Sequence, residues 1–145
     1  MKAVLQRVKK AEVQVKDKKI SEIGAGLLIL LGVKKGDTEK QTEDLAQMCV
    51  NLRIFEDSNG KFNLSLKDVN GEALVVSQFT LLADTSRGRR PSFTDAEEPD
   101  KAKRLYEFFI DRLKNFGITT KSGIFGERML VSLENNGPVT IILEV

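Results

Sequence analysis

The spacing of hydrophobic and polar residues predicts strands along much of the chain. Residues 2–8 alternate in character, with Leu5 and Arg7 on one face, and residues 11–16 alternate in the same way. Residues 26–33 are almost entirely apolar, which is typical of a strand that is covered on both faces. Further strand-like segments occupy residues 53–56, 73–79, 118–121, 129–133 and 139–145.

Two segments repeat their hydrophobic residues with the period of a helix instead. The first follows Thr38, which forms a capping-box pattern with Gln41. The second runs from about Asp100 to Phe116 and is followed by Gly117, a residue type that often ends helices. The predicted apolar stripes are Leu45, Met48, Cys49 and Leu52 in the first helix and Leu105, Phe109, Leu113 and Phe116 in the second.

Strands therefore outnumber helices, and most of them follow one another directly. This order predicts an α+β fold: a curled, largely antiparallel or mixed β-sheet system, barrel-like, with two main helices packed outside. The stretch 84–100 is rich in charge, Gly and Pro, but it lies between predicted elements, so we interpret it as a long loop. We find no linker and no repeat, and we expect a single domain over residues 1–145.

Composition removes whole classes of chemistry. The chain has no histidine and one cysteine, Cys49. The lack of histidine excludes Ser-His and Cys-His catalysis and histidine-ligated metals. The single cysteine excludes an internal disulfide and a thiolate-rich zinc site. We expect no metal and no cofactor, and we expect Cys49, which lies on an apolar stripe, to be a buried core residue.

Charge and hydropathy predict a cytoplasmic protein. The 23 basic and 21 acidic residues leave a net charge of +2, so any contact with RNA must come from a local patch. The longest apolar run, around residues 23–33, is too short and too rich in glycine to span a bilayer. The N-terminal residues lack the apolar core of a signal peptide, and we expect no membrane contact.

Polar residues end the strand that is predicted at residues 73–79. Ser77, Gln78 and Thr80 carry hydroxyl and amide groups, which are costly to bury unless they are bonded or used. Such a cluster suits the binding of a carbonyl or a ribose hydroxyl. The alternative is a strand that ends in ordinary capping groups.

A Gly-Pro pair lies between two predicted strands, within residues 135–140. Asn-Gly is a common hairpin turn, so the simple interpretation is a turn. Pro138 changes this picture, because proline fixes φ and removes an N–H group. A rigid Gly137–Pro138 tip exposes main-chain carbonyls that can accept bonds from an ammonium group or exclude a misplaced side chain. An inward-facing Arg7 needs acceptors of that kind.

Two further segments suit contact with RNA. Arg87, Arg89 and Arg90 surround a glycine in the long loop, a composition that favours phosphate contact. The alternative is a solvated charged loop. Phe125 stands between two glycines, which suits either stacking on a base or a place in the core.

Together these segments resemble a known family. The motifs Ser77-Gln78-Phe79-Thr80-Leu81 and Asn135-Asn136-Gly137-Pro138-Val139-Thr140, in this order and in a chain of this length, are similar to those of the D-aminoacyl-tRNA deacylases. The similarity covers essentially the whole chain, including Gln6-Arg7-Val8 and Gly88-Arg89-Arg90-Pro91-Ser92-Phe93. The family often carries Asp where this chain has Asn136, and we expect no change of activity from that difference.

The resemblance implies an enzyme that hydrolyses the ester between a D-amino acid and the 3′-terminal adenosine of tRNA. It implies activity on glycine mischarged on tRNA-Ala as well, because glycine is achiral. It further implies a homodimer with active sites at the subunit interface. A cis Gly137–Pro138 peptide of one subunit would enter the partner's pocket and exclude L-amino acids, which makes the reaction a chiral proofreading step in translation.

The resemblance also assigns roles to residues. The catalytic segment would be Ser77, Gln78, Phe79 and Thr80. The motif that reads chirality would be Asn135, Gly137, Pro138 and Thr140, supported by Arg7. The candidate contacts to the terminal adenosine and the rest of the tRNA are Phe125, Met129, Arg87, Arg89 and Arg90.

Two mechanisms without histidine stay open. In one, the Thr80 hydroxyl attacks the ester and forms an acyl-enzyme. In the other, which we favour, the 2′-hydroxyl of the terminal ribose helps to activate or position water. An aminoacyl ester is already activated, so orientation and stabilisation of the oxyanion are the main tasks. The candidate donors are the N–H groups near Phe79 and Thr80 and the amide of Gln78.

Three other functions predict different behaviour. A related editing enzyme acts on a different mischarged tRNA, but the stand-alone length and the intact Gly137–Pro138 pair argue against it. A non-catalytic RNA-binding module binds tRNA and leaves the ester intact. A structural protein leaves the polar cluster at Ser77 to Thr80 without a purpose.

Overall fold

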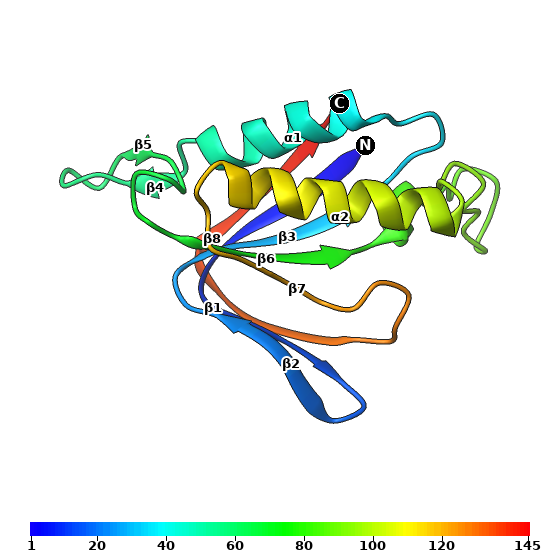
Figure 1. Ribbon diagram of the computed structural model, residues 1–145, viewed down its shortest axis with the longest axis horizontal. Helices are drawn as coiled ribbons and strands as arrows, with labels where there is room; N and C mark the ends of the chain where they lie inside the picture. The colour runs from blue at the N-terminus through cyan, green and yellow to red at the C-terminus, as the bar shows by residue number, and fades with distance from the viewer.

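A computed structural model describes residues 1–145, and its centre is a six-stranded mixed sheet (Figure 1). The strands follow the order β2-β1-β3-β6-β7, and β8 pairs with the other edge of β1. The pairings of β1 are antiparallel, whereas β3, β6 and β7 run parallel. The strands are β1 (Lys2–Val15), β2 (Lys18–Ile23), β3 (Gly26–Gly32), β6 (Glu72–Ser77), β7 (Thr120–Ser122) and β8 (Leu130–Glu144).

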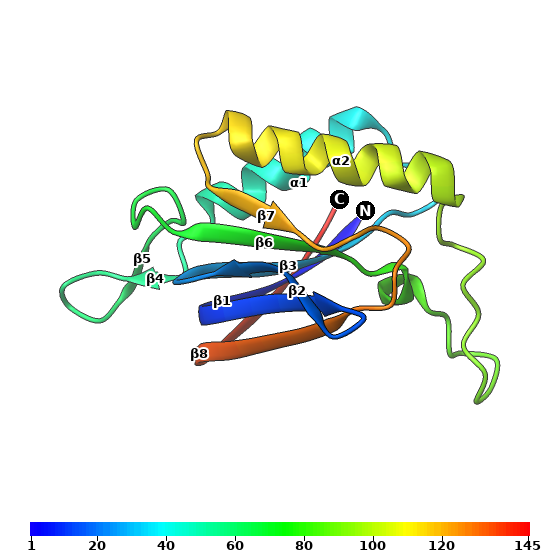
Figure 2. The same cartoon turned by 60° about the horizontal axis from the view of Figure 1, so that its bottom comes forward.

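Two helices, α1 (Glu39–Asn51) and α2 (Pro99–Asn115), lie together on one face of this sheet (Figure 2). The larger hydrophobic core fills the space between them and the sheet. A smaller cluster, which includes Val13, Ile23 and Leu74, lies on the opposite face, where β1 and β2 curl over. The predicted α+β class, with a curled mixed sheet and two helices outside, is confirmed.

A short hairpin projects from one end of the molecule beyond α1 (Figure 1). Its strands are β4 (Phe55–Glu56) and β5 (Phe62–Leu64). At the other end of the sheet, the 3-10 turn η1 (Phe79–Leu82) follows β6 directly.

The predicted helices are present, with small differences. The N–H of Thr38 donates to Oε1 of Gln41 at 2.9 Å, as the capping-box pattern predicts. Met48, however, is 41% exposed and does not belong to the buried stripe. The stripe of α1 that packs on the core is Thr42, Leu45, Ala46, Cys49 and Val50.

Two predicted strand boundaries are wrong because one strand changes partners there and the other contains a bulge. β1 is continuous, although residues 2–8 and 11–16 were expected to form separate strands. It pairs with β3 up to Val8 and with β2 from Ala11, so the exposed Lys9 and Lys10 mark the exchange. β8 likewise joins two predicted strands into one. The prediction missed β2, β5 and η1.

Cys49 is fully buried in the larger core, as expected. Burial raises the pKa of its thiol to about 12, so the group stays neutral. No helix of the structure combines the length and the apolar character that a membrane crossing requires.

Candidate active site

The polar cluster that was predicted from Ser77 to Thr80 forms the exit from β6. Ser77 still pairs with Leu31 of β3, and the N–H of Gln78 donates to the carbonyl of Leu31 at 2.8 Å. The chain then turns into η1, which leaves the ring of Phe79 55% exposed. The strand predicted to reach residue 79 therefore ends two residues earlier, and the change of direction presents Phe79 and Thr80 to solvent.

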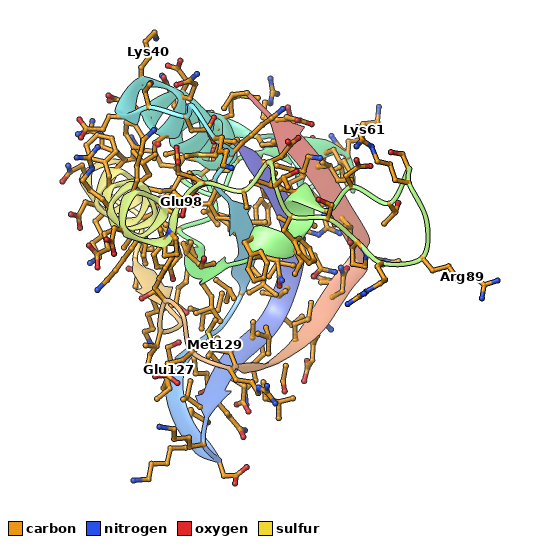
Figure 3. The ribbon with its side chains drawn as sticks, turned by 90° about the vertical axis from the view of Figure 1, so that its right-hand side faces the viewer. Lys40, Lys61, Arg89, Glu98, Glu127 and Met129 are labelled. Carbon is orange, nitrogen blue, oxygen red and sulfur yellow. The ribbon has the colours of Figure 1, made fainter.

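A pocket of about 490 Å³ opens beside this exit. Eight of its 14 lining residues are hydrophobic, so it suits a flat apolar group such as a nucleobase. Ser77, Gln78 and Phe79 form one wall, and Phe125 and Met129 belong to the loop that forms the other. Figure 3 shows Met129 and Glu127 on this loop, between β7 and β8. The structure thus brings these predicted residues together.

Thr80 has a single hydrogen-bond partner at its hydroxyl. The amide nitrogen of Gln78 donates to Oγ1 of Thr80. No carboxylate or amine contacts this oxygen. The N–H groups of Phe79 and Thr80 open the 3-10 turn, where no earlier residue of the turn can accept them. The cluster therefore offers main-chain donors rather than an activated nucleophile.

The carboxylate of Glu97 on the pocket wall is already engaged. Nζ of Lys101 donates to it at 2.7 Å, and the N–H groups of Glu98 and Gly36 donate at 3.1 and 3.2 Å. These bonds, led by that of Lys101, lower the pKa of Glu97. A carboxylate held ionised in this way is a poor general base.

Tyr106 and Gly123, neither of which was predicted as a site residue, hold the far wall. The Tyr106 ring lies against Phe125, with centroids 5.7 Å apart, and its hydroxyl donates to the carbonyl of Val75 at 2.8 Å. The N–H of Gly123 donates to the same carbonyl at 3.0 Å, and a Cβ at this glycine would collide with Sδ of Met129. Burial raises the pKa of Tyr106 to about 12. Gly123, two residues before Phe125, was the available signal in the sequence.

The Gly-Pro segment is a bulge within β8 rather than a turn between two strands. Gln6 of β1 pairs with Thr140, and Val8 pairs with Asn135, so residues 136–139 all stand opposite Arg7. The Gly137–Pro138 peptide bond is cis, and Gly137 has φ +148°. We call residues 136–138 the tip, since all three are exposed.

Asn135 closes the base of the tip with its side chain. Oδ1 accepts the N–H of Val139 at 2.7 Å, while Nδ2 donates to the carbonyl of Val139 at 3.2 Å. Nδ2 also lies 3.2 Å from Oγ1 of Thr140, which receives a further bond from Gln6 at 3.4 Å. The amide therefore replaces the strand partner that the bulge removes from Val139.

Arg7 is buried behind the tip, at 5% exposure. Its Nε donates to the carbonyl of Asn136 and its Nη1 to the carbonyl of Ile54, both at 2.7 Å. The expected inward arginine with carbonyl acceptors is present. Its contact to Ile54 was not expected, because the two residues are remote in sequence.

The tip and the pocket lie far apart within one chain. Arg7 pairs with Leu27 of β3, and Leu27 pairs with Ala73 of β6, four residues before Ser77. That offset is about 13 Å along the strands, and the three strand spacings from β8 to β6 add about 14 Å across the sheet. None of the residues of the tip lines the pocket.

The arginine loop, residues 85–91, projects past the pocket. The N–H and carbonyl groups of Asp84 and Ser92 pair at 2.8 and 2.9 Å and close its base. The Phe93 ring meets Phe79 edge-on at 5.0 Å, which connects the loop to η1. Figure 3 shows Arg89 directed away from the molecule. Arg87, Arg89 and Arg90 are exposed and make no ion pair.

Comparison with known proteins gives consistent results. The family model described as D-Tyr-tRNA(Tyr) deacylase matches residues 4–144. A D-aminoacyl-tRNA deacylase of Aquifex aeolicus is 56% identical over 99% of this chain and 97% of its own length. That of Carboxydothermus hydrogenoformans is 53% identical over the full length of both.

Solved structures agree with the fold. The structure named c-Myc DNA Unwinding Element Binding Protein is 42% identical, covers 100% of this chain and 99% of its own, and superposes with a TM-score of 0.94. A probable eukaryotic D-amino acid tRNA deacylase covers 99% and 98% with a TM-score of 0.83. Its identity is 19%, so it supports the fold alone.

Proposed function

The chain belongs to the D-aminoacyl-tRNA deacylase family, which makes it a hydrolase of the ester bond of D-aminoacyl-tRNA, and we propose that it reads the chirality of its substrate with a tip supplied by a partner subunit. One observation carries the proposal: the tip and the pocket are separated by more than 13 Å of sheet in one chain. A tip that acts at a pocket must therefore act at the pocket of another copy.

The exposed edge of β8 supports a homodimer. β8 pairs only with β1, so its outer edge has free main-chain groups that a second copy can cover. Ile142 is 67% exposed and Leu130 63%, unusually high values for large aliphatic residues of a strand. The tip stands on the same strand, so a partner that covers β8 receives it.

Main-chain atoms suit the tip to the rejection of L-amino acids. Gly137 has no side chain, and the carbonyl of Asn136 just before it is fixed from behind by the Arg7 guanidinium. In a pocket that holds the α-amino group and the ester, the side chain of an L-residue points at this backbone and that of a D-residue points away. Exclusion by a rigid wall leaves the D side chain unread, so many D-amino acids are accepted.

The same geometry extends the activity to glycine. A glycyl ester has no side chain on either side of its α-carbon, so nothing collides with the tip. We therefore include glycine mischarged on tRNA-Ala among the substrates.

The nucleotide end of the substrate fits the apolar pocket. The terminal adenine would stack near Phe125 and Met129, with the ester directed at the N–H groups of Phe79 and Thr80. The arginines of the projecting loop would contact phosphates of the acceptor stem. Because its substrate is charged tRNA, we place the enzyme in the cytoplasm.

Catalysis then consists of orientation and oxyanion stabilisation. Water attacks the ester carbonyl, and the main-chain N–H groups of Phe79 and Thr80 donate to the developing oxyanion. The bond from carbonyl carbon to the 3′-oxygen breaks, the 3′-oxygen takes up a proton, and the D-amino acid leaves. The ribose 2′-hydroxyl positions the water, since the Thr80 hydroxyl has no base beside it.

A mixed dimer tests the proposal. One subunit carries Phe125→Asp, which places a carboxylate where the adenine stacks, and the other carries Gly137→Ala, which damages the tip. The active pocket of this dimer lies in the subunit with the damaged tip. Hydrolysis of D-tyrosyl-tRNA with L-tyrosyl-tRNA spared supports a tip supplied by the partner. Hydrolysis of both esters shows that each pocket uses its own tip and refutes the proposal.

A further inference from the structure

The hairpin of β4 and β5 is well ordered by its own bonds but contributes little to the core. The N–H of Asp57 donates to the carbonyl of Lys61 at 2.9 Å, and Oδ1 of Asp57 accepts the N–H groups of Asn59 and Lys61 at 2.8 and 3.1 Å. These main-chain donors lower the pKa of Asp57. An isolated hairpin of two short strands is rarely stable in water, so the contacts of this hairpin with the rest of the chain are informative.

The hairpin surrounds the guanidinium of Arg7. The carbonyl of Ile54, just before β4, accepts from Nη1 at 2.7 Å in a buried bond. The carboxylate of Glu56 lies 3.5 Å from Nη2. The Phe62 ring of β5 lies against the guanidinium, with its centroid 5.3 Å from Cζ. One segment of the chain therefore contacts Arg7 through a carbonyl, a carboxylate and an aromatic ring.

The opposite edge of the same guanidinium contacts the tip. Nε donates to the carbonyl of Asn136 at 2.7 Å, and Nη2 lies 3.1 Å from the position that a Cβ at Gly137 would occupy. The guanidinium is planar and rigid, so a group that fixes one edge also fixes the other. Whatever holds Arg7 from the hairpin side therefore sets the position of the Asn136 carbonyl and of the backbone at Gly137.

We propose that the β4–β5 hairpin is a positioning element for chiral selection, in which Glu56 and Phe62 hold Arg7 so that Arg7 holds the tip. The proposal rests on the function proposed above, since it assigns to the hairpin the accuracy of the tip. Glu56 and Phe62 are positioning residues, because they act on the substrate only through Arg7. They are 52% exposed at the side chain and 54% exposed, respectively, which is consistent with a role other than core packing.

The position of the tip matters because steric repulsion between the tip and an L side chain rises steeply as the distance between them falls. A displacement of the tip by a fraction of an ångström opens space for an L side chain. The same displacement leaves the donors of Phe79 and Thr80 in place, since they belong to the other end of the sheet. Loss of the hairpin contacts therefore raises hydrolysis of the L-ester and leaves hydrolysis of the D-ester almost unchanged.

The test compares D- and L-tyrosyl-tRNA hydrolysis by single-turnover kinetics in the full-length protein. Phe62→Ala removes the ring, Phe62→Tyr keeps it, and Glu56→Gln removes the charge. We expect the ratio of D to L rate constants to fall about threefold to tenfold in Phe62→Ala and less in Glu56→Gln, with near wild-type values in Phe62→Tyr. Lys61→Ala is the matched control, since Lys61 lies on the same hairpin and points away from the molecule (Figure 3).

A second background isolates the route through Arg7. In Arg7→Lys the planar contact is already lost, so Phe62→Ala should change the ratio no further. If Phe62→Ala leaves the ratio of D to L rate constants unchanged, whether or not both rate constants fall, the hairpin is a structural element only and the inference is wrong. If the wild-type protein itself fails to distinguish the two esters, the proposed function is wrong, and the inference falls with it.

Discussion

Asn135 and Val139 are joined in both directions by one side chain, with Oδ1 accepting the Val139 N–H at 2.7 Å and Nδ2 donating to its carbonyl at 3.2 Å. We predict that Asn135→Asp loosens the tip. A carboxylate still accepts the Val139 N–H, but its second oxygen replaces the donor Nδ2 and repels the carbonyl of Val139. The expected cost is about 1–2 kcal/mol of unfolding free energy, with increased hydrolysis of L-aminoacyl-tRNA. Denaturant unfolding measures the stability, and rates of hydrolysis of D- and L-tyrosyl-tRNA measure the selectivity.

Asn136→Asp is the matched control. Asn136 contributes its main-chain carbonyl to Arg7 and exposes its side chain. The same chemical change one residue later should therefore leave the D to L ratio within about twofold. Equal effects at the two positions would show that charge near the tip, rather than the bonds to Val139, decides the outcome.

Gly123 controls the far wall of the pocket through Met129. A Cβ at this position collides with Sδ of Met129, so Gly123→Ala should push the thioether out of place. We predict a KM for tRNA that rises a few-fold, an almost unchanged kcat, and a stability loss of about 1–2 kcal/mol. Steady-state kinetics on D-tyrosyl-tRNA separate the two constants.

The double variant Gly123→Ala/Met129→Ala identifies the route of this effect. Removal of the thioether leaves the new methyl group nothing to displace, so Gly123→Ala should add little in that background. A full additional rise of KM would assign the effect to the β7–β8 loop backbone instead.

Periodicity predicted those elements whose burial is uniform. β3 is buried along nearly its whole length and α2 presents one apolar face, so a local pattern was sufficient. The pattern divides β1 because this strand changes partners midway, and it divides β8 because a bulge interrupts the pairing of β8 with β1. Lys9 and Lys10 stand where β1 exchanges β3 for β2, and such an exchange depends on strands that are remote in sequence.

The features of the site likewise fall into those that a local sequence pattern predicts and those that depend on contacts between remote residues. Residue types identified the clusters at Ser77–Thr80 and at Gly137–Pro138, since polar groups at a strand end and a Gly-Pro pair are local signals. The distance between them depends on the register of β1, β3 and β6. The contacts of Arg7 with Ile54 and Phe62 join residues about 50 positions apart. No local pattern encodes such contacts.

The arginine loop should act on binding rather than on chemistry. Arg87, Arg89 and Arg90 lack partner carboxylates and are exposed, so each is free to replace a counterion on a phosphate. We predict that their joint replacement by alanine weakens tRNA binding and lowers the slope of log K against log salt by about two to three. Filter binding over a salt series measures the slope.

Lys40→Ala is the control for this measurement. Lys40 lies on α1, on the far side of the molecule from Arg89 (Figure 3), and its side chain is 82% exposed. Loss of this charge should leave the slope unchanged. A slope that is equal in wild type and the triple arginine variant would exclude the loop from phosphate contact.

Cys49 should be inert in the folded protein. Burial raises the pKa of its thiol to about 12, so the thiolate needed for reaction is scarce at pH 8, and the side chain is fully buried. We predict negligible labelling by a thiol reagent in native buffer and complete labelling in denaturant. Rapid native labelling would show that α1 opens locally.

Thr80→Val distinguishes the two mechanisms of hydrolysis. The Thr80 hydroxyl accepts a bond from Gln78 and has no base beside it, so its loss should disturb only local orientation. We predict a single-turnover rate on D-tyrosyl-tRNA within about tenfold of wild type, whereas loss of a true nucleophile typically costs a thousandfold or more. Substrate ending in 2′-deoxyadenosine provides the complementary measurement. If the ribose hydroxyl positions the water, this substrate should react far more slowly with both the wild-type protein and Thr80→Val. The loss from the missing 2′-hydroxyl should then add to the small loss from Thr80→Val. A thousandfold loss in Thr80→Val with normal turnover of the deoxy substrate would instead establish an acyl-enzyme on Thr80.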